Sequence, residues 1–235
     1  MNMASDSEKP VNKFVQMLRS SRTIPITPWR ADSTWSIGGG RHHIQRFLIL
    51  IFGLFIFGIG DSLLIITGLG NAPWSVLAQG ISLNSPLSIG EATFFISLTV
   101  LALWIPLKQM PGLGTLANIL VIAVAIEIGL AFIPEVDNLA LKYFYIFSGI
   151  ALVGIGSALY ITCGLGTGPR DGLMTGLHFK TGIRVGRVRL GIELVALIIG
   201  ALLGGAVGVG TALFALLIGQ SVAISLGVVD RLTTK

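Results

Sequence analysis

Three acidic residues interrupt apolar stretches of the chain, and they are the first candidates for chemistry: Asp61, Glu127 and Glu193. An ionised side chain at the centre of a bilayer costs roughly 2.5–3.5 kcal/mol, so such residues face the protein interior or a water-filled cavity. They could relay a proton or cation, or contact a solute. Alternatively, each is a hydrogen-bonded packing residue or reaches water near the interface. We expect no Lys or Arg inside the membrane to pair with them.

A second candidate set follows a proline in a basic connection: Arg170 and Asp171, with Arg184 and Arg187 further along. In the first turn of a helix the macrodipole favours Asp171 and opposes Arg170. One interpretation is a binding site for an anionic lipid head group or anionic solute at the cytoplasmic mouth. The other is a surface Arg–Asp pair in a segment that anchors the topology.

Signatures of catalysis and of cofactor binding are missing from the sequence. There is no nucleophile–base pair, and the single cysteine, Cys163, excludes an internal disulfide and a metal site built from several thiolates. Two glycine-rich stretches lack the Lys-Ser/Thr ending of a phosphate-binding loop, and no strand precedes either. We therefore expect no enzyme activity, no cofactor and no metal. The net charge of +5 has a topological explanation, so we expect no nucleic-acid partner.

The composition predicts an all-α, polytopic membrane protein. The chain is 53% hydrophobic and only 11% charged, whereas soluble domains carry about 25% charged residues. Apolar stretches near the ~20 residues needed to cross a bilayer occur six times. We place these predicted spans at 44–67, 91–107, 115–133, 142–163, 188–206 and 210–228.

An internal duplication organises the chain. Shifting the sequence by 96 residues places 68–75 (GLGNAPWS) on 164–171 (GLGTGPRD), with many further glycines in register. We predict two repeats, roughly 44–133 and 140–229, forming a single membrane domain at 44–229. Under the same shift, none of the three acids has an ionisable counterpart.

The repeated motif predicts a long helix, a glycine break and a short helix, such as 73–82. Glycines end a helix by adopting positive φ, and proline suits the first turn of the next helix. The first span is long enough to cross before its break, so we expect the break at a membrane mouth. The residues given this structural role are Gly68, Gly70, Pro73, Gly164, Gly166, Gly168 and Pro169.

The distribution of Lys and Arg predicts the orientation. Of the 16 Lys and Arg residues, all except Lys142 fall on one side of the six spans, which places both termini in the cytoplasm. Because each repeat has three spans, the second repeat is predicted to be inverted relative to the first. Residues 1–43 form a cytoplasmic segment, with an amphipathic surface helix around 11–18 and a flexible linker before the first span. Residues 230–235 form a cytoplasmic tail.

The two motifs at 68–74 and 164–171, with Val185-Gly186 and the Gly208-x-Gly210-Thr211 stretch, resemble the YczE/YyaS/YitT group of bacterial integral membrane proteins. The resemblance covers about 44–229 and implies a multi-pass protein of the bacterial cytoplasmic membrane, without a settled activity. Two functions stay open. One is a carrier for a small solute. The other is a non-transporting scaffold or accessory protein that binds anionic lipid or a protein partner. The sequence leaves the oligomeric state open.

Overall fold

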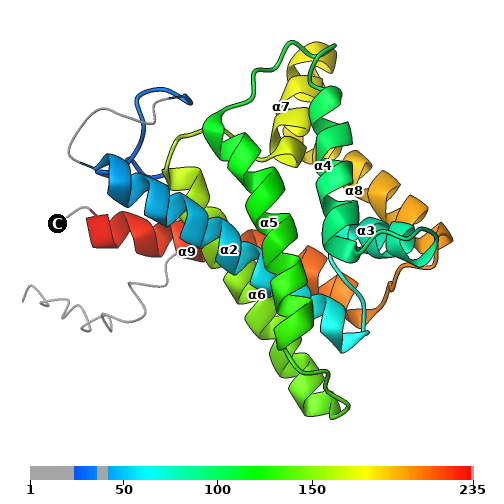
Figure 1. Cartoon of the computed structure of the whole chain (residues 1–235). Coiled ribbons are helices and arrows are strands. Elements are labelled where there is room, and N and C mark those ends of the chain that lie inside the picture. Colours follow the sequence, from blue (N-terminus) through cyan, green and yellow to red (C-terminus); the bar gives the residue numbers. More distant parts are fainter. Residues whose placement is uncertain (1–23, 36–41, 234–235) are drawn as a thin grey trace, which may run out of the picture.

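The computed structural model describes residues 24–35 and 42–233 (Figure 1). The described residues form eight helices and no strand. The predicted surface helix around 11–18 lies outside them. In chain order the helices are α2 (His43–Thr67), α3 (Pro73–Leu83), α4 (Ile89–Ala102), α5 (Leu113–Phe132), α6 (Leu139–Thr162), α7 (Pro169–Thr181), α8 (Val185–Leu202) and α9 (Val209–Thr233).

Four of these helices are long and apolar enough to cross a membrane: α2, α5, α6 and α9. They match four of the predicted spans to within a few residues. The other two predicted spans differ more. Helix α4 ends at Ala102 rather than at 107, because Pro106 lacks the N–H that a continuing helix needs. Helix α8 begins at Val185 and ends at Leu202, before Gly204, which has a φ of 90°.

The helices form two groups that lie side by side (Figure 1). In one group α2 packs against α5 and α6, and α6 packs against α9. In the other, α3 packs against α8 and α4, and α7 packs against α4 and α8. Helix α5 joins the groups through its contact with α4. The equivalent pair in the second repeat, α8 and α9, lacks comparable packing.

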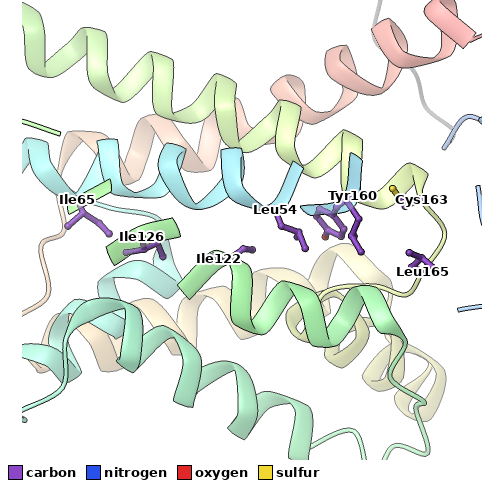
Figure 2. Packing of buried hydrophobic residues seen from close by; sticks show 8 residues of the cluster. Leu54, Ile65, Ile122, Ile126, Tyr160, Cys163 and Leu165 are labelled. Carbon is purple, nitrogen blue, oxygen red and sulfur yellow. The ribbon is translucent and has the colours of Figure 1, made fainter. Parts of the chain in front are cut away.

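One apolar core lies between α2, α5 and α6 (Figure 2). Leu54, Ile126 and Tyr160 are buried there, each from a different helix. Leu165 closes the end of this core from the break after α6.

Glycines allow α2 and α6 to cross closely. A Cβ on Gly60 would lie 2.7 Å from the Gly149 carbonyl oxygen, and one on Gly53 would lie 3.0 Å from the Gly156 oxygen. The pairs run in opposite directions along the two helices, so α2 and α6 are antiparallel. The shift of 96 residues maps Gly53 onto Gly149 and Gly60 onto Gly156, so each glycine pair corresponds to the other pair.

Each glycine break bends sharply and docks against the opposite repeat. Gly68 and Gly70 have φ of 64° and 110°, and their counterparts in the second break have 68° and 111°. The Leu69 carbonyl accepts a hydrogen bond from Gly210 N at 2.9 Å, and the equivalent bond, from Gly114 N to the Leu165 carbonyl, is 2.7 Å. The start of the last helix of each repeat, α5 or α9, therefore holds the break of the other repeat.

Residues 24–35 pack against the second break, although the sequence predicted a flexible linker here. Ala31 N donates to the Cys163 carbonyl at 2.8 Å, and the Thr27 hydroxyl donates to the Thr162 carbonyl at 3.1 Å. Leu113 N donates to the Thr34 carbonyl at 3.0 Å. This part of the linker is therefore held by hydrogen bonds to backbone carbonyls.

Candidate functional site

A cavity of about 170 Å³ lies where the short helices α3 and α7 begin. Every described helix contributes at least one residue to its lining. Both breaks reach it, through Pro73 and Pro169, the first residues of α3 and α7. The first break, which we expected at a membrane mouth, therefore also borders this cavity. The chain turns back after the glycines and starts the short helix at the cavity.

The lining is built from equivalent residues of the two repeats. Most lining positions have a counterpart 96 residues away that also lines the cavity. These pairs are Phe57/Val153, Asp61/Ser157, Ala72/Gly168, Pro73/Pro169, Trp74/Arg170, Thr93/Arg189, Ser97/Glu193, Asn118/Phe214 and Ile122/Ile218. The cavity therefore lies at the junction of the repeats, and its two halves differ in polarity.

Asp61 supplies a buried carboxylate from α2. Its side chain is 2% exposed, and its Oδ2 accepts a hydrogen bond from the Ser75 hydroxyl at 2.9 Å. Its Oδ1 is buried and has no hydrogen-bond partner among the described residues. Buried polar atoms are almost always hydrogen-bonded, so an orphaned carboxylate oxygen in a cavity wall indicates a place for a ligand donor.

Arg170 supplies the positive charge at the cavity. Its guanidinium lies over the Trp74 ring, 4.9 Å from the centroid, a cation–π distance. It makes no hydrogen bond or ion pair within the described parts of the chain, although its charge acts on Asp61, Asp171 and Glu193. We expected no Lys or Arg to pair with the buried acids, and Arg170 forms no ion pair with Asp61, but its charge acts on that carboxylate. Arg170 follows the proline that begins α7, and that turn lies inside the fold.

Asp171 is held differently from Asp61. Its carboxylate accepts a hydrogen bond from the Tyr160 hydroxyl at 2.9 Å. The start of α7 is fixed by the Trp104 indole, which donates to the Pro169 carbonyl at 2.9 Å. In the repeat register, acid and serine change places. In the first repeat Asp61 lies on α2 and Ser75 on α3, whereas in the second repeat Ser157 lies on α6 and Asp171 on α7.

Glu193 lines the cavity from α8 and pairs with Arg189 at 2.9 Å, four residues earlier. These side chains are 31% and 50% exposed, respectively. Their counterparts in the first repeat, Ser97 and Thr93, are 5% and 3% exposed. The cavity is therefore more accessible beside α8 than beside α4.

The other predicted site residues lie outside the cavity lining. The carboxylate of Glu127 accepts a hydrogen bond from Gly90 N at 2.6 Å and joins α5 to the start of α4. Arg184 and Arg187 are exposed at the start of α8.

The sequence analysis missed Trp74, Tyr160 and Arg189 as lining residues. One sequence signal pointed to the first of these: the 96-residue shift pairs Trp74 with Arg170, and the structure brings these two side chains into contact. No group of three or more His, Cys, Asp or Glu that could hold a metal occurs within the described residues. What the cavity offers is hydrogen bonding and charge, suited to a small polar ligand.

Comparison with known proteins assigns the chain to a family. A family of unknown function, DUF6198, matches residues 44–226. An uncharacterized protein of Haemophilus influenzae is 43% identical over 216 residues, covering 92% of this chain and 97% of that protein. The uncharacterized membrane protein YczE of Bacillus subtilis is 31% identical over 185 residues, covering 78% of this chain and 86% of YczE.

The uncharacterized protein YyaS of Bacillus subtilis is 24% identical over 191 residues, covering 80% of this chain and 95% of YyaS. No solved structure matches the chain. The apolar helices and the membrane relative agree that it is an integral membrane protein. The chain therefore belongs to the DUF6198 family and is of the YczE and YyaS type that its paired motifs indicated.

Proposed function

We propose that this protein is a carrier for a small polar solute, which binds in the cavity between the two repeats. The observation that carries the proposal is the cavity itself. It lies at the repeat junction, where two broken helices begin again, and its wall contains a buried carboxylate and a guanidinium with unused hydrogen-bonding capacity. Secondary transporters recurrently place their sites at such junctions, between inverted repeats and beside discontinuous helices.

The proposed topology has six spans in two inverted repeats, with both termini in the cytoplasm of a bacterial cell. The antiparallel, reciprocal glycine contacts between α2 and α6 support the inversion. The distribution of Lys and Arg supports the orientation. Helix α4, at about 21 Å, is shorter than a ~30 Å hydrocarbon core. In this topology the turns at 103–108 complete its crossing.

Alternating access follows from a difference between the repeats. Beside the first repeat, α4 packs against α5, and Glu127 ties them together through Gly90 N. Beside the second, Gly186 and Ala223 occupy the equivalent positions, and a Cβ on Gly186 would meet nothing within 4 Å. The cavity is then closed toward the outside and open toward the cytoplasm. If instead α8 packed against α9 and α4 separated from α5, the cavity would open to the outside.

A second candidate function is a membrane scaffold, favoured by the exposed basic residues around the α7–α8 connection. Lys180, Arg184 and Arg187 are exposed there. On a cytoplasmic face each would add about 1 kcal/mol of attraction to anionic lipid. This surface is compatible with a carrier, but it does not explain the polar cavity.

Uptake into proteoliposomes tests the carrier proposal. Purified protein would be reconstituted and offered a panel of small labelled anions, cations, zwitterions and neutral amides. A carrier gives saturable uptake of at least one class, lost in Arg170→Gln and retained in Arg184→Gln, which removes the same charge outside the cavity. Uptake of no class above empty liposomes would contradict the carrier and favour the scaffold.

A further inference from the structure

We propose that the ligand of the cavity is a small zwitterion of the amino-acid class, with its ammonium group on Asp61 and its carboxylate on Arg170. This inference rests on the proposed function, since it names the solute that the same cavity would carry.

Asp61 provides an unused acceptor. Ser75 occupies its Oδ2, while Oδ1 is buried without a partner among the described residues. A carboxylate oxygen taken out of water in this way costs free energy unless a donor reaches it, and the cost is greatest for a charged group. An ammonium group supplies both the donor and the opposite charge.

Arg170 provides an unused donor fork. The guanidinium lies over the Trp74 ring, yet its N–H groups find no acceptor in the described structure. The planar fork matches a carboxylate with two parallel hydrogen bonds, a geometry that a lysine ammonium lacks. A ligand carboxylate is therefore the complement that this side chain lacks.

The other charged groups at the cavity are already engaged. Asp171 accepts from the Tyr160 hydroxyl, and Glu193 is paired with Arg189. Within the described residues, Asp61 Oδ1 and the Arg170 guanidinium are the charged lining groups that this chain leaves without a hydrogen-bond partner. A simple anion would leave Asp61 unsatisfied and add a third negative charge next to Asp61 and Asp171. A simple cation would face Arg170. A zwitterion satisfies both groups without adding net charge.

The size of the cavity limits the side chain. Its volume of about 170 Å³ is close to that of an engineered cavity of ~150 Å³ that accepts benzene. About six heavy atoms therefore fit, as in glycine, alanine or β-alanine. Ile122 and Ile218 line the wall and suit a methyl group better than a polar side chain.

The test is titration calorimetry of the full-length protein in detergent with three ligands of similar size: alanine, propionate and propylamine. We expect alanine to bind about 30-fold or more tightly than either single-charge analogue, since each analogue leaves one of the two charged groups unpaired. Phenylalanine should not bind. Propionate or propylamine binding as tightly as alanine, or no binding of glycine, alanine or β-alanine, would overturn the inference.

Variants assign the two contacts. Asp61→Asn should abolish alanine binding and improve binding of propionate relative to alanine. Arg170→Lys keeps the charge but loses the fork, and it should weaken alanine binding, while Arg184→Gln should leave it unchanged. Wild-type affinity in both cavity variants would contradict the assignment. If Asp61→Asn fails to fold, the ligand series on the wild-type protein still decides the matter.

Uptake separates this inference from the carrier proposal. Alanine binding without alanine uptake in proteoliposomes would support the zwitterion site and contradict transport. Saturable uptake of a purely anionic solute, without alanine binding, would overturn the zwitterion and leave the carrier standing.

Discussion

The two repeats share a backbone frame but close the cavity unequally. In the first repeat α4 packs against α5, and Gly90 N donates to Glu127. In the second repeat α8 lacks comparable packing with α9, and Gly186 has open space around it. The frame common to both repeats builds the cavity. The side chains that differ between them set its charge and the side on which it is accessible.

The largest effect we expect concerns the orientation of the two short helices. Single cysteines at Asn84 and Thr181, at the ends of α3 and α7, lie on exposed positions of opposite repeats. In a Cys163→Ser background in intact cells, Asn84→Cys should react with an impermeant thiol reagent and Thr181→Cys should not. The reverse pattern would contradict the orientation, and labelling of both would contradict the inverted repeat.

Valine substitutions at the break glycines compare the two repeats directly. Gly70→Val and Gly166→Val each impose positive φ on a β-branched residue, at about 1–3 kcal/mol. Each Cβ also meets a threonine hydroxyl of the opposite repeat, Thr211 at 2.7 Å or Thr115 at 2.9 Å, so overpacking adds about 1–3 kcal/mol.

Folded yield in detergent should therefore fall sharply for both variants. Gly68→Val is the matched control, because its φ is 64° but its Cβ would meet nothing within 4 Å. Gly68→Val should therefore be destabilised only by the strain of positive φ and not by overpacking. Equal losses in all three variants would show that docking of the breaks on the opposite repeat does not matter.

A smaller effect on stability should distinguish Gly90, where α4 packs against α5, from its counterpart Gly186, which has open space around it. Gly90→Ala places a methyl group 2.5 Å from Glu127 Cγ and 2.6 Å from the Ala123 carbonyl, so we expect a loss of about 1–3 kcal/mol. The equivalent Gly186→Ala meets nothing and should be neutral, or stabilising by up to about 1 kcal/mol. Thermal unfolding in detergent measures both. Equal destabilisation would mean that both sides are closed.

Much of the framework was predictable from the sequence, because its causes are local. Apolar length predicted the positions of α2, α5, α6 and α9, and Gly-Leu-Gly followed by proline predicted the breaks and the starts of α3 and α7. At the start of α4, Ser88 and Glu91 cap the helix reciprocally, a bonding pattern that residues at this spacing form. Each of these features depends on residues close together in the chain.

The site was less predictable, because its contacts join distant segments. Arg170 has the sequence features of a cytoplasmic anchor, since nothing nearby shows that its turn folds inward onto Trp74. Glu127 has the sequence features of an intramembrane acid. Its partner, the Gly90 N–H, is supplied by α4, which is distant in the chain. The repeat register contained the missing information, because it pairs Trp74 with Arg170.

The most direct test of the central claim is the accessibility of equivalent cavity positions from each side of the membrane. Ser97→Cys and Glu193→Cys, in a Cys163→Ser background, would be labelled with an impermeant reagent in intact cells and in inside-out vesicles. The account predicts that Glu193→Cys reacts from the cytoplasmic side. Ser97→Cys should be protected from both sides until Glu127→Ala is added, and should then react from the outside. Equal reactivity of both cysteines from one side, unchanged by Glu127→Ala, would contradict an alternating cavity between the repeats.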